Sequence, residues 1–267
     1  MGYSLEGKHV LVTGGSSGIG AALAEGFARA GATVGICARR AERLDEVLAR
    51  VREHAPASKS WTVDLSDLDG VAAFAKRVED DLGGVDVLVN NAGIPKRRKV
   101  NDLTADVVES VMAINYFSPI RLTLALLPGI EARGGRIVNI SSVAARLGPP
   151  AEAAYAASKA AVTAWSESMQ VDLGIAGSPV RVHVVNPGVF DTELFHLPDN
   201  DAFTAQVEML PVESIVDPIL NAVTNDLFEL YVPEWFGDVA AGKAKDVGTF
   251  LNGSIAYLKA EQDKARA

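Results

Sequence analysis

Sulfur and histidine are scarce in this sequence, and their scarcity excludes two kinds of stabilising site. Cys37 is the single cysteine, so no disulfide can form within the chain, and a reducing compartment such as the cytoplasm is expected. The chain has 4 histidines, and none of them has a cysteine or carboxylate at ligand spacing. No metal site is therefore predicted.

Positive charge and long apolar runs are also in short supply. Lysine and arginine number 25 against 34 aspartate and glutamate residues, a formal net charge of -9. A nucleic-acid backbone must be neutralised by basic side chains, so nucleic acid is not expected as a partner. No apolar run follows a basic start at the N-terminus, and no stretch is expected to be long and uncharged enough to span a bilayer. A small molecule is the expected ligand.

The chain does have enough apolar residues to form one hydrophobic core. At 267 residues, of which 48% are hydrophobic, it is long for one domain and short for two, so a single domain over residues 1–267 is predicted. Short β-branched runs alternate with longer helical patterns, as in repeated strand-helix-strand units. The predicted fold is α/β: a single-domain, Rossmann-like, doubly wound parallel sheet of seven strands with helices on both faces. Strands are expected at 9–13, 33–38, 60–63, 85–89, 136–140, 181–185 and 229–232, and helices at 20–30, 41–52, 68–82, 105–133 and 152–173.

Two regions depart from this alternation. Residues 192–212 are rich in Asp, Pro and Phe, which predicts an irregular lobe over a cleft. Residues 235–267 follow the last expected strand and form a helical extension, with an amphipathic stretch at 247–264. Packing of this stretch on the domain is expected, although a partner or a membrane surface would also accept it.

A glycine-rich turn follows the first strand. Its sequence is Thr13-Gly14-Gly15-Ser16-Ser17-Gly18-Ile19-Gly20, and a helix begins at once. Backbone amides at the start of a helix, where no side chain covers them, point their N–H groups at a phosphate group and bind it with the help of the helix dipole. The glycine spacing differs from the G-x-G-x-x-G fingerprint, but the strand before and the helix after favour nucleotide binding over a turn that merely needs flexibility.

Tyr155 and Lys159 form the most informative pair in the chain. Residues four apart on a helix share a face. A cation about 4 Å from the phenol, at an effective dielectric of about 20, would lower its pKa by about three units from about 10. Tyr155 is therefore predicted to titrate near neutral pH and to serve as a general acid or base. By itself the pair is weak evidence for catalysis, since tyrosine and lysine also occur at this spacing on solvated helices.

Several motifs in one order resemble the short-chain dehydrogenase/reductase family over roughly residues 5–195. These are Thr13-Gly14-x-x-x-Gly18-x-Gly20, Asn90-Asn91-Ala92-Gly93, Ser142, Tyr155-x-x-x-Lys159 and Pro187-Gly188. The resemblance implies hydride transfer between a nicotinamide and a carbinol carbon, with Tyr155 as the proton carrier and Ser142 as hydrogen-bond partner of the substrate oxygen. It implies that Lys159 holds the nicotinamide ribose and that Asn115 positions a water linking Lys159 to solvent.

The same resemblance implies which residues hold the cofactor. Asn90 would meet the adenosine ribose, and Asn91 would brace the sheet. The implied binding residues are Gly14, Ser16, Ser17, Gly18, Ile19 and Gly20 in the first turn, Asp64 and Leu65 at adenine, Asn91, Ala92 and Gly93 beside the cofactor, Tyr155 and Lys159, and Pro187, Gly188, Val189 and Thr192 around the nicotinamide.

The end of the second strand favours NADP(H), with NAD(H) possible. A carboxylate there would bond the ribose 2′-hydroxyl of NAD and repel a 2′-phosphate. This chain has Ala38 at that position, followed by Arg39 and Arg40, whose planar donors suit a phosphate. An NADP(H)-dependent oxidoreductase is the leading prediction. An NAD(H)-linked alcohol or hydroxyacyl dehydrogenase is the alternative.

The substrate is less well specified. Apolar residues of the lobe suit an apolar ketone or secondary alcohol, or they only hold the lobe shut; they are Leu194, Phe195, Leu197, Phe203 and Met209. The basic run Lys96-Arg97-Arg98-Lys99 is interpreted as a solvated loop, with steering of a phosphate-bearing substrate such as a coenzyme A thioester as the alternative.

Other functions and the state of assembly stay open at this point. A non-catalytic nucleotide-binding module and a nucleotide-sugar epimerase or dehydratase are weaker alternatives. Alanines on the helix at 152–173 allow close helix approach, and in the family this helix and the preceding one pair across a two-fold axis. A homo-oligomer, dimer or tetramer, is expected, although the tail lacks the ending that supports tetramers in the family.

Overall fold

The computed structural model describes residues 2–201 and 208–266. Strands and helices alternate along nearly the whole chain. In order they are β1 His9–Thr13, α1 Gly18–Arg29, β2 Thr33–Ala38, α2 Ala41–His54, β3 Lys59–Thr62, α3 Val71–Leu82, β4 Val87–Asn90, η1 Val100–Asp102, α4 Ala105–Met112, η2 Ala113–Phe117, α5 Ser118–Ala132, β5 Arg136–Ile140, α6 Ala144–Leu147, α7 Ala153–Ile175, β6 Arg181–Pro187, η3 Glu193–Phe195, η4 Val212–Ile215, α8 Val216–Thr224, β7 Glu229–Val232, α9 Trp235–Lys245 and α10 Val247–Arg266.

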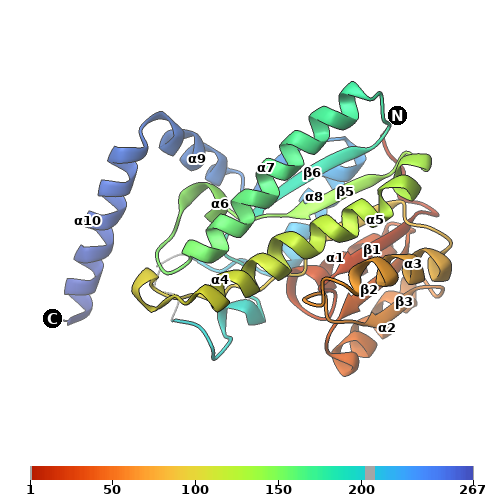
Figure 1. Cartoon of the computed structure of the whole chain (residues 1–267), viewed down its shortest axis with the longest axis horizontal. Coiled ribbons are helices and arrows are strands. Elements are labelled where there is room, and N and C mark those ends of the chain that lie inside the picture. The colour runs from red at the N-terminus through yellow and green to blue at the C-terminus, as the bar shows by residue number, and fades with distance from the viewer. Residues whose placement is uncertain (1, 202–207, 267) are drawn as a thin grey trace.

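The strands form one sheet in the order β3-β2-β1-β4-β5-β6-β7 (Figure 1). All neighbouring strands pair in parallel. The chain moves outward from β1 to β3 and then returns to β4 beside β1, so the strand order reverses between β1 and β4. In such sheets ligands bind at the carboxyl ends of the strands, at the point of reversal. The predicted seven-stranded, doubly wound fold is confirmed.

Alternate residues of each strand point to opposite faces of the sheet, and each face is covered by its own helices. Val10 and Val12 pack with α1, α2 and α8 in one apolar cluster. Leu11, between them, packs with α3, α5 and α7 in a second cluster on the other face. Because both faces are covered, the strands consist of nearly continuous apolar residues, which explains why their bounds at 9–13, 33–38, 136–140 and 229–232 could be predicted.

The predicted helix at 105–133 is interrupted, which corrects the sequence interpretation. Residues Ala113–Phe117 form a π-turn between α4 and α5, and the Ser118 amide donates to the Ala113 carbonyl, five residues back. Such single π-turns are frequent at functional positions. Asn115 lies in the middle of this turn and is 1% exposed. The apolar periodicity on either side continues across the turn, so the pattern alone did not reveal it.

The expectation that no stretch is long and apolar enough to span a bilayer is also corrected. Within the residues that the structure describes, the stretch Ala105–Ala132 is long and apolar enough to cross a bilayer by length and composition, with a third of its window, 33%, buried inside the protein. The core helix of a soluble protein passes the same test. Here α5 contributes Leu122 and Leu126 to the apolar cluster on one face of the sheet.

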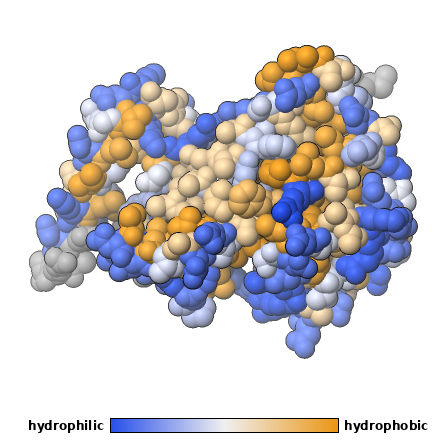
Figure 2. Space-filling view, viewed as in Figure 1, coloured by the Kyte–Doolittle hydropathy of each residue, from blue (hydrophilic) through white to orange (hydrophobic). Residues whose placement is uncertain are grey.

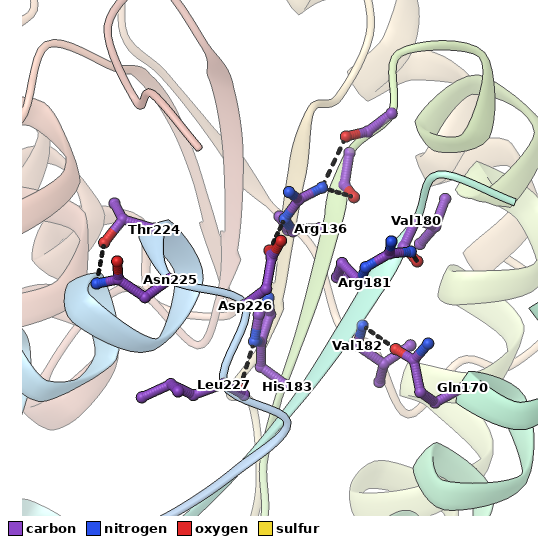
Figure 3. Close-up of polar contacts among 12 residues, drawn as sticks. Arg136, Gln170, Val180, Arg181, Val182, His183, Thr224, Asn225, Asp226 and Leu227 are labelled. Atoms are coloured by element: carbon purple, nitrogen blue, oxygen red, sulfur yellow. Dashed lines mark hydrogen bonds and ion pairs between the residues drawn. The ribbon is translucent and has the colours of Figure 1, made fainter. Parts of the chain in front are cut away.

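The amino edge of the sheet is held by side chains that bond to neighbouring elements (Figure 3). Arg136 at the start of β5 forms an ion pair of 2.8 Å with Asp226, in the turn between α8 and β7. His183 of β6 shares a hydrogen bond of 2.7 Å with the Leu227 carbonyl, and Gln170 of α7 accepts a bond of 2.9 Å from the Val182 amide. These contacts fix β7 and α7 against the central strands.

The C-terminal helix α10 extends away from the domain (Figure 1). Its apolar residues Val247, Leu251 and Ile255 are 48%, 42% and 53% exposed, at a spacing of four that places them on one face. Packing of this stretch on the domain was expected. In the structure its main neighbour is α9, where Lys243 lies 5.9 Å from the Phe250 ring.

Candidate active site

Two cavities meet at the carboxyl edge of the sheet. The first, of about 230 Å³, lies over the ends of β1, β2, β3 and β4. The second, of about 260 Å³, lies over β5 and β6 and is bounded by the start of α7 and by the lobe at 192–195. Ile19, Asn91, Gly93 and Thr192 line both cavities, so the two form one continuous cleft.

The glycine turn leaves backbone room at the head of α1. Gly14 has a φ of 67°, a conformation that favours glycine. A Cβ at Gly20 would lie 2.3 Å from the Gly14 carbonyl oxygen, so neither position accepts a side chain. Ser17 caps α1 without a side-chain hydrogen bond, which leaves the first helix amides to a ligand. The turn fits the pyrophosphate of a dinucleotide.

Nearly all of the predicted cofactor residues border this cleft. The first cavity is lined by Gly14, Ser16, Ser17, Gly18, Ile19, Arg39, Arg40, Asp64, Leu65, Asn91, Ala92, Gly93 and Thr192. The second is lined by Tyr155, Lys159, Pro187, Gly188 and Val189. Gly20 lines neither cavity; its lack of a side chain lets the turn close on itself.

The two arginines after β2 differ in their surroundings. Arg40 donates to Glu193 at 2.7 Å and to Ser17 at 3.3 Å. Arg39 is exposed, lines the first cavity, and makes no hydrogen bond or ion pair with the described part of the chain. Arg39 is therefore the residue whose guanidinium is available to a phosphate at the end of β2.

Asp64 is constrained by its own neighbour. Its carboxylate accepts bonds of 2.9 Å from the Ser66 amide and 2.7 Å from the Ser66 hydroxyl. These bonds hold the pKa of Asp64 below its usual value, first through the backbone amide and then through the hydroxyl. The carboxylate stays ionised at the rim of the cavity, beside the buried Leu65.

The predicted role of Asn90 at a ribose is wrong, whereas the bracing role predicted for Asn91 is confirmed by its bonds to Thr13 of β1. Asn90 is buried and donates to Thr123 at 3.0 Å and to Asn139 at 2.8 Å, so it connects β4 to α5 and β5 instead of facing a ribose. Asn91 lines both cavities. Its amide group also donates to the Thr13 carbonyl at 2.8 Å, which holds the glycine turn. The physical reason is strand alternation, which turns successive side chains to opposite sides.

Tyr155 and Ser142 lie together in the second cavity. The Ser142 hydroxyl lies near enough to the Tyr155 phenol to lower the pKa of that phenol, and it accepts a bond of 3.1 Å from the Ala144 amide. The neighbouring Ser141 bonds the Lys159 carbonyl at 3.1 Å and Thr163 at 2.8 Å. Ser141 thus connects β5 to α7, and Ser142 faces the cavity.

Lys159 does not lower the pKa of Tyr155 as predicted. Its ammonium donates to the Ile140 carbonyl at 2.8 Å and lies 5.7 Å from the centre of the Tyr155 ring. Burial raises the pKa of Tyr155 above its usual value, the Glu152 carboxylate raises it further, and the nearby Ser142 hydroxyl lowers it. Burial also lowers the pKa of Lys159 to about 8. The prediction that Tyr155 titrates near neutral pH is therefore wrong for this structure, because burial raises the pKa of the phenol and Lys159 does not offset that rise.

Asn115 supports the cleft without touching Lys159. Its carbonyl oxygen accepts from the Ile94 amide at 2.8 Å, and its amide donates to the Ile94 carbonyl at 3.0 Å and to Ser158 at 3.0 Å. These bonds join the π-turn, the loop after β4 and α7. The water-positioning role implied by the family resemblance stays a prediction.

The basic run 96–99 is not a solvated loop. Arg97 is 2% exposed and donates to the Phe195 carbonyl at 3.0 Å and the Asp201 carbonyl at 3.2 Å. Lys96 and Arg98 both pair with Asp199. The cations therefore fasten the lobe to the loop after β4. The complementary stretch Asp199-Asn200-Asp201 was the sequence signal for this contact, about 100 residues away along the chain.

The apolar lobe residues divide between two environments. Leu194 and Phe195 line the second cavity, whereas Leu197 is 41% exposed. Met209 is partly buried outside both cavities, and Phe203 lies outside the described residues. Glu152 and Phe236 are among the lining residues that the sequence interpretation missed. Glu152 was detectable as the carboxylate one helical turn before Tyr155, but nothing in the sequence placed Phe236 of α9 over the cleft.

Comparisons with known proteins agree with this geometry. A family model described as short chain dehydrogenase matches residues 8–201. An uncharacterized oxidoreductase of Mycobacterium tuberculosis is 34% identical over 278 residues, which cover 92% of this chain and 80% of the relative. Dehydrogenase/reductase SDR family member 7B of Rattus norvegicus is 40% identical over 195 residues, covering 69% of this chain and 58% of that protein.

Solved structures give the same result for the fold. A short chain dehydrogenase from Burkholderia cenocepacia in complex with NADP has a TM-score of 0.76 at 31% identity, covering 86% of this chain and 97% of its own. A short-chain dehydrogenase/reductase from Burkholderia phymatum in complex with NAD has a TM-score of 0.82 at 22% identity, and the match covers 92% of this chain and 95% of that protein. At that identity the second likeness concerns the fold alone.

Proposed function

Because the chain belongs to the short-chain dehydrogenase/reductase family, we propose that this oxidoreductase is an NADP(H)-dependent carbonyl reductase or alcohol dehydrogenase. Its substrate is an apolar ketone or secondary alcohol. One observation carries the proposal: Tyr155, Ser142 and Lys159 line a largely apolar cavity that is continuous with the cavity around the glycine turn.

The residues of the chain have separate tasks in this reaction. The nicotinamide cofactor, when bound, supplies the hydride to the carbonyl carbon or accepts it back. The Tyr155 phenol gives its proton to the carbonyl oxygen, and the Ser142 hydroxyl bonds that oxygen as negative charge develops on it. The Lys159 ammonium, held by the Ile140 carbonyl in the same cavity, binds the hydroxyls of the nicotinamide ribose. Because its pKa is raised, Tyr155 holds its proton at neutral pH, which favours reduction of a ketone.

The preference for NADP(H) rests on the end of β2. Ala38 offers no carboxylate to a ribose 2′-hydroxyl, and Arg39 offers an exposed guanidinium at the rim of the first cavity. A 2′-phosphate is the group that this combination binds best. NAD(H) remains the alternative cofactor, since structural neighbours hold one or the other.

We also propose that the protein is a cytoplasmic homo-oligomer. Figure 2 shows apolar residues gathered over α5 and α7 on one face of the molecule. Phe117, Leu124 and Val171 on or beside these helices are 47%, 53% and 60% exposed, and a second copy of the chain packed on this face would cover them. Light scattering after gel filtration tests the proposal, and a mass of one chain would contradict it.

The direct test is a screen of ketones with NADPH and of secondary alcohols with NADP+, followed by nicotinamide absorbance. Turnover by the wild-type chain and its loss in Tyr155→Phe would support the proposed reaction. Full activity in that variant would show that Tyr155 is not the acid-base group. Turnover with NADH that exceeds turnover with NADPH would contradict the cofactor preference.

A further inference from the structure

The second cavity contains one carboxylate among apolar walls. Its lining includes Leu147, Pro149, Leu194, Phe195 and Phe236. Glu152 lines the same space, and no other aspartate or glutamate does so among the residues that the structure describes. A carboxylate in such surroundings is costly unless a partner compensates its charge.

Glu152 feels the charge of Arg97 but has no hydrogen-bonded or ion-paired partner within the described chain. The residue is 8% exposed and occupies the N-cap position of α7, yet its side chain makes no cap hydrogen bond. No hydrogen bond or ion pair joins its carboxylate to another described residue. The cation that influences it, Arg97, is already bonded to the Phe195 and Asp201 carbonyls. The acceptor oxygens of Glu152 are therefore available to a ligand.

The position of Glu152 relative to Tyr155 defines where that ligand group must lie. The residues are three apart at the start of one helix, so they share a face with Cβ atoms about 5 to 6 Å apart. The Tyr155 phenol marks the position of the reacting oxygen. Both residues line the second cavity, so a group bound to Glu152 lies in the same cavity as that oxygen.

We propose that Glu152 is a specificity-determining residue that binds a protonated amine, so that the natural substrate is an amino ketone or the corresponding amino alcohol. A full positive charge compensates a buried carboxylate better than a neutral hydroxyl does. The net charge of -9 also attracts cations to the protein. This inference rests on the proposed carbonyl chemistry and adds the charge of the substrate and the spacing of its two polar groups.

Matched ketones test the proposal. 4-Aminocyclohexanone carries its ammonium across the ring from the carbonyl, and 4-methylcyclohexanone has a methyl group of similar size there. The measured quantity is the ratio of kcat/KM for the amine to kcat/KM for the methyl compound. In Glu152→Gln this ratio should fall about tenfold or more, since a hydrogen bond to a charged group is lost. An unchanged ratio would overturn the proposal.

A second variant separates charge recognition from damage to the fold. In Glu152→Lys the preference should reverse, so that 4-oxocyclohexanecarboxylate is reduced better than 4-aminocyclohexanone. Thermal melting and NADPH fluorescence titration establish that both variants fold and load the cofactor. If both variants fold, load the cofactor and still favour the amine, Glu152 does not recognise the substrate charge.

Equilibrium binding keeps this inference distinct from the proposed reaction. Calorimetry of trans-4-aminocyclohexanol with the whole chain in the presence of NADPH requires no turnover, because the reduced cofactor cannot accept a hydride from the alcohol. Weaker binding to Glu152→Gln supports the inference even if no ketone is reduced, in which case the proposed reaction fails alone. Reduction of 4-methylcyclohexanone together with equal binding of the amine by both proteins would leave the reaction standing and overturn the role of Glu152.

Discussion

The amino and carboxyl edges of the parallel sheet carry similar polar side chains but surround them differently. At the amino edge Arg136 pairs with Asp226 at 2.8 Å, and Asp86 accepts from the His9 amide at 2.9 Å and from Lys8 at 3.3 Å. At the carboxyl edge the Glu152 carboxylate has no hydrogen-bonded or ion-paired partner among the described residues and faces a cavity. The charged groups at the first edge pair with each other, whereas Glu152 at the second is left for a ligand.

The difference separates stability from chemistry within one sheet. A buried polar group satisfied by the protein contributes to folding, and its removal leaves a partner unpaired. A buried group that faces a cavity has a shifted pKa and open bonding capacity, which is typical of functional positions. Tyr155, Lys159 and Glu152 are all shifted by burial first. Mutations at the amino edge should therefore lower stability, whereas mutations at the carboxyl edge should lower turnover.

The largest expected effect is that of Tyr155→Phe on turnover. Loss of the proton carrier should reduce kcat about 10²- to 10⁴-fold while the melting temperature stays close to that of the wild type. Steady-state kinetics with the best ketone from the screen, together with calorimetric melting, checks both halves. A variant with a lowered melting temperature and an unchanged kcat would show that Tyr155 has a structural role instead of a catalytic one.

Arg136→Ala is the matched change at the amino edge. It removes the partner of Asp226 and a cation 4.0 Å from the Tyr3 ring. We expect a loss of about 1 to 3 kcal/mol in the free energy of unfolding, measured by urea titration, with kcat per folded molecule retained. Lost turnover in folded protein would show that the two edges are coupled.

Arg39→Ala should produce the next largest effect, on cofactor choice. We expect the KM for NADPH to rise about 10- to 100-fold, since a bond between two charged groups is lost, and the KM for NADH to change little. Arg40→Ala is the control, because Arg40 is already held by Glu193 at 2.7 Å. Equal effects of Arg39→Ala on the two cofactors would count against a 2′-phosphate at this position.

Glu152→Gln should shift the pH profile of alcohol oxidation. The Glu152 carboxylate raises the pKa of Tyr155, and the nearby Arg97 and Ser142 lower it. Removing the negative charge stabilises the phenolate, so the pKa of Tyr155 falls and the rise of kcat/KM with pH moves to lower pH. The measurement is kcat/KM from pH 6 to 10 with a neutral alcohol. A shift to higher pH would contradict the assigned sign.

Asp199→Asn should give the smallest effect. Lys96 and Arg98 pair with Asp199 at an exposed position, where ion pairs are weak and screened by salt. We expect about a two- to threefold rise in substrate KM at low salt, comparable to loss of one exposed pair, and little difference from the wild type in high salt. A persistent difference at high salt would mean that Asp199 acts through something other than charge.

The sequence predicted the parts of the molecule that depend on local patterns. Apolar strand runs located the sheet, and the glycine turn and the Tyr155-Lys159 spacing located the cleft, because each depends on residues close together in the chain. The predictions failed where burial or distant contacts decide. The pKa of Tyr155 depends on loss of solvent, which spacing does not report. Arg97 is bonded to the lobe residues Phe195 and Asp201, far along the chain, so the acidic stretch that matches the basic run could be linked to it only once the fold was known.

The π-turn at Ala113–Phe117 has a consequence for chain length. An α-helix rotates about 100° per residue, and the turn holds one residue more than an α-helical turn would. Deleting one residue there would restore an ordinary α-helical turn, so Val111 of α4 and Leu122 of α5, both 0% exposed, would keep their inward faces. What the deletion would remove is the geometry that places Asn115 against Ile94 and Ser158. The shortened chain should therefore fold, but the loop after β4 should lose its attachment to α7, which faster hydrogen exchange at the Ile94 amide would reveal.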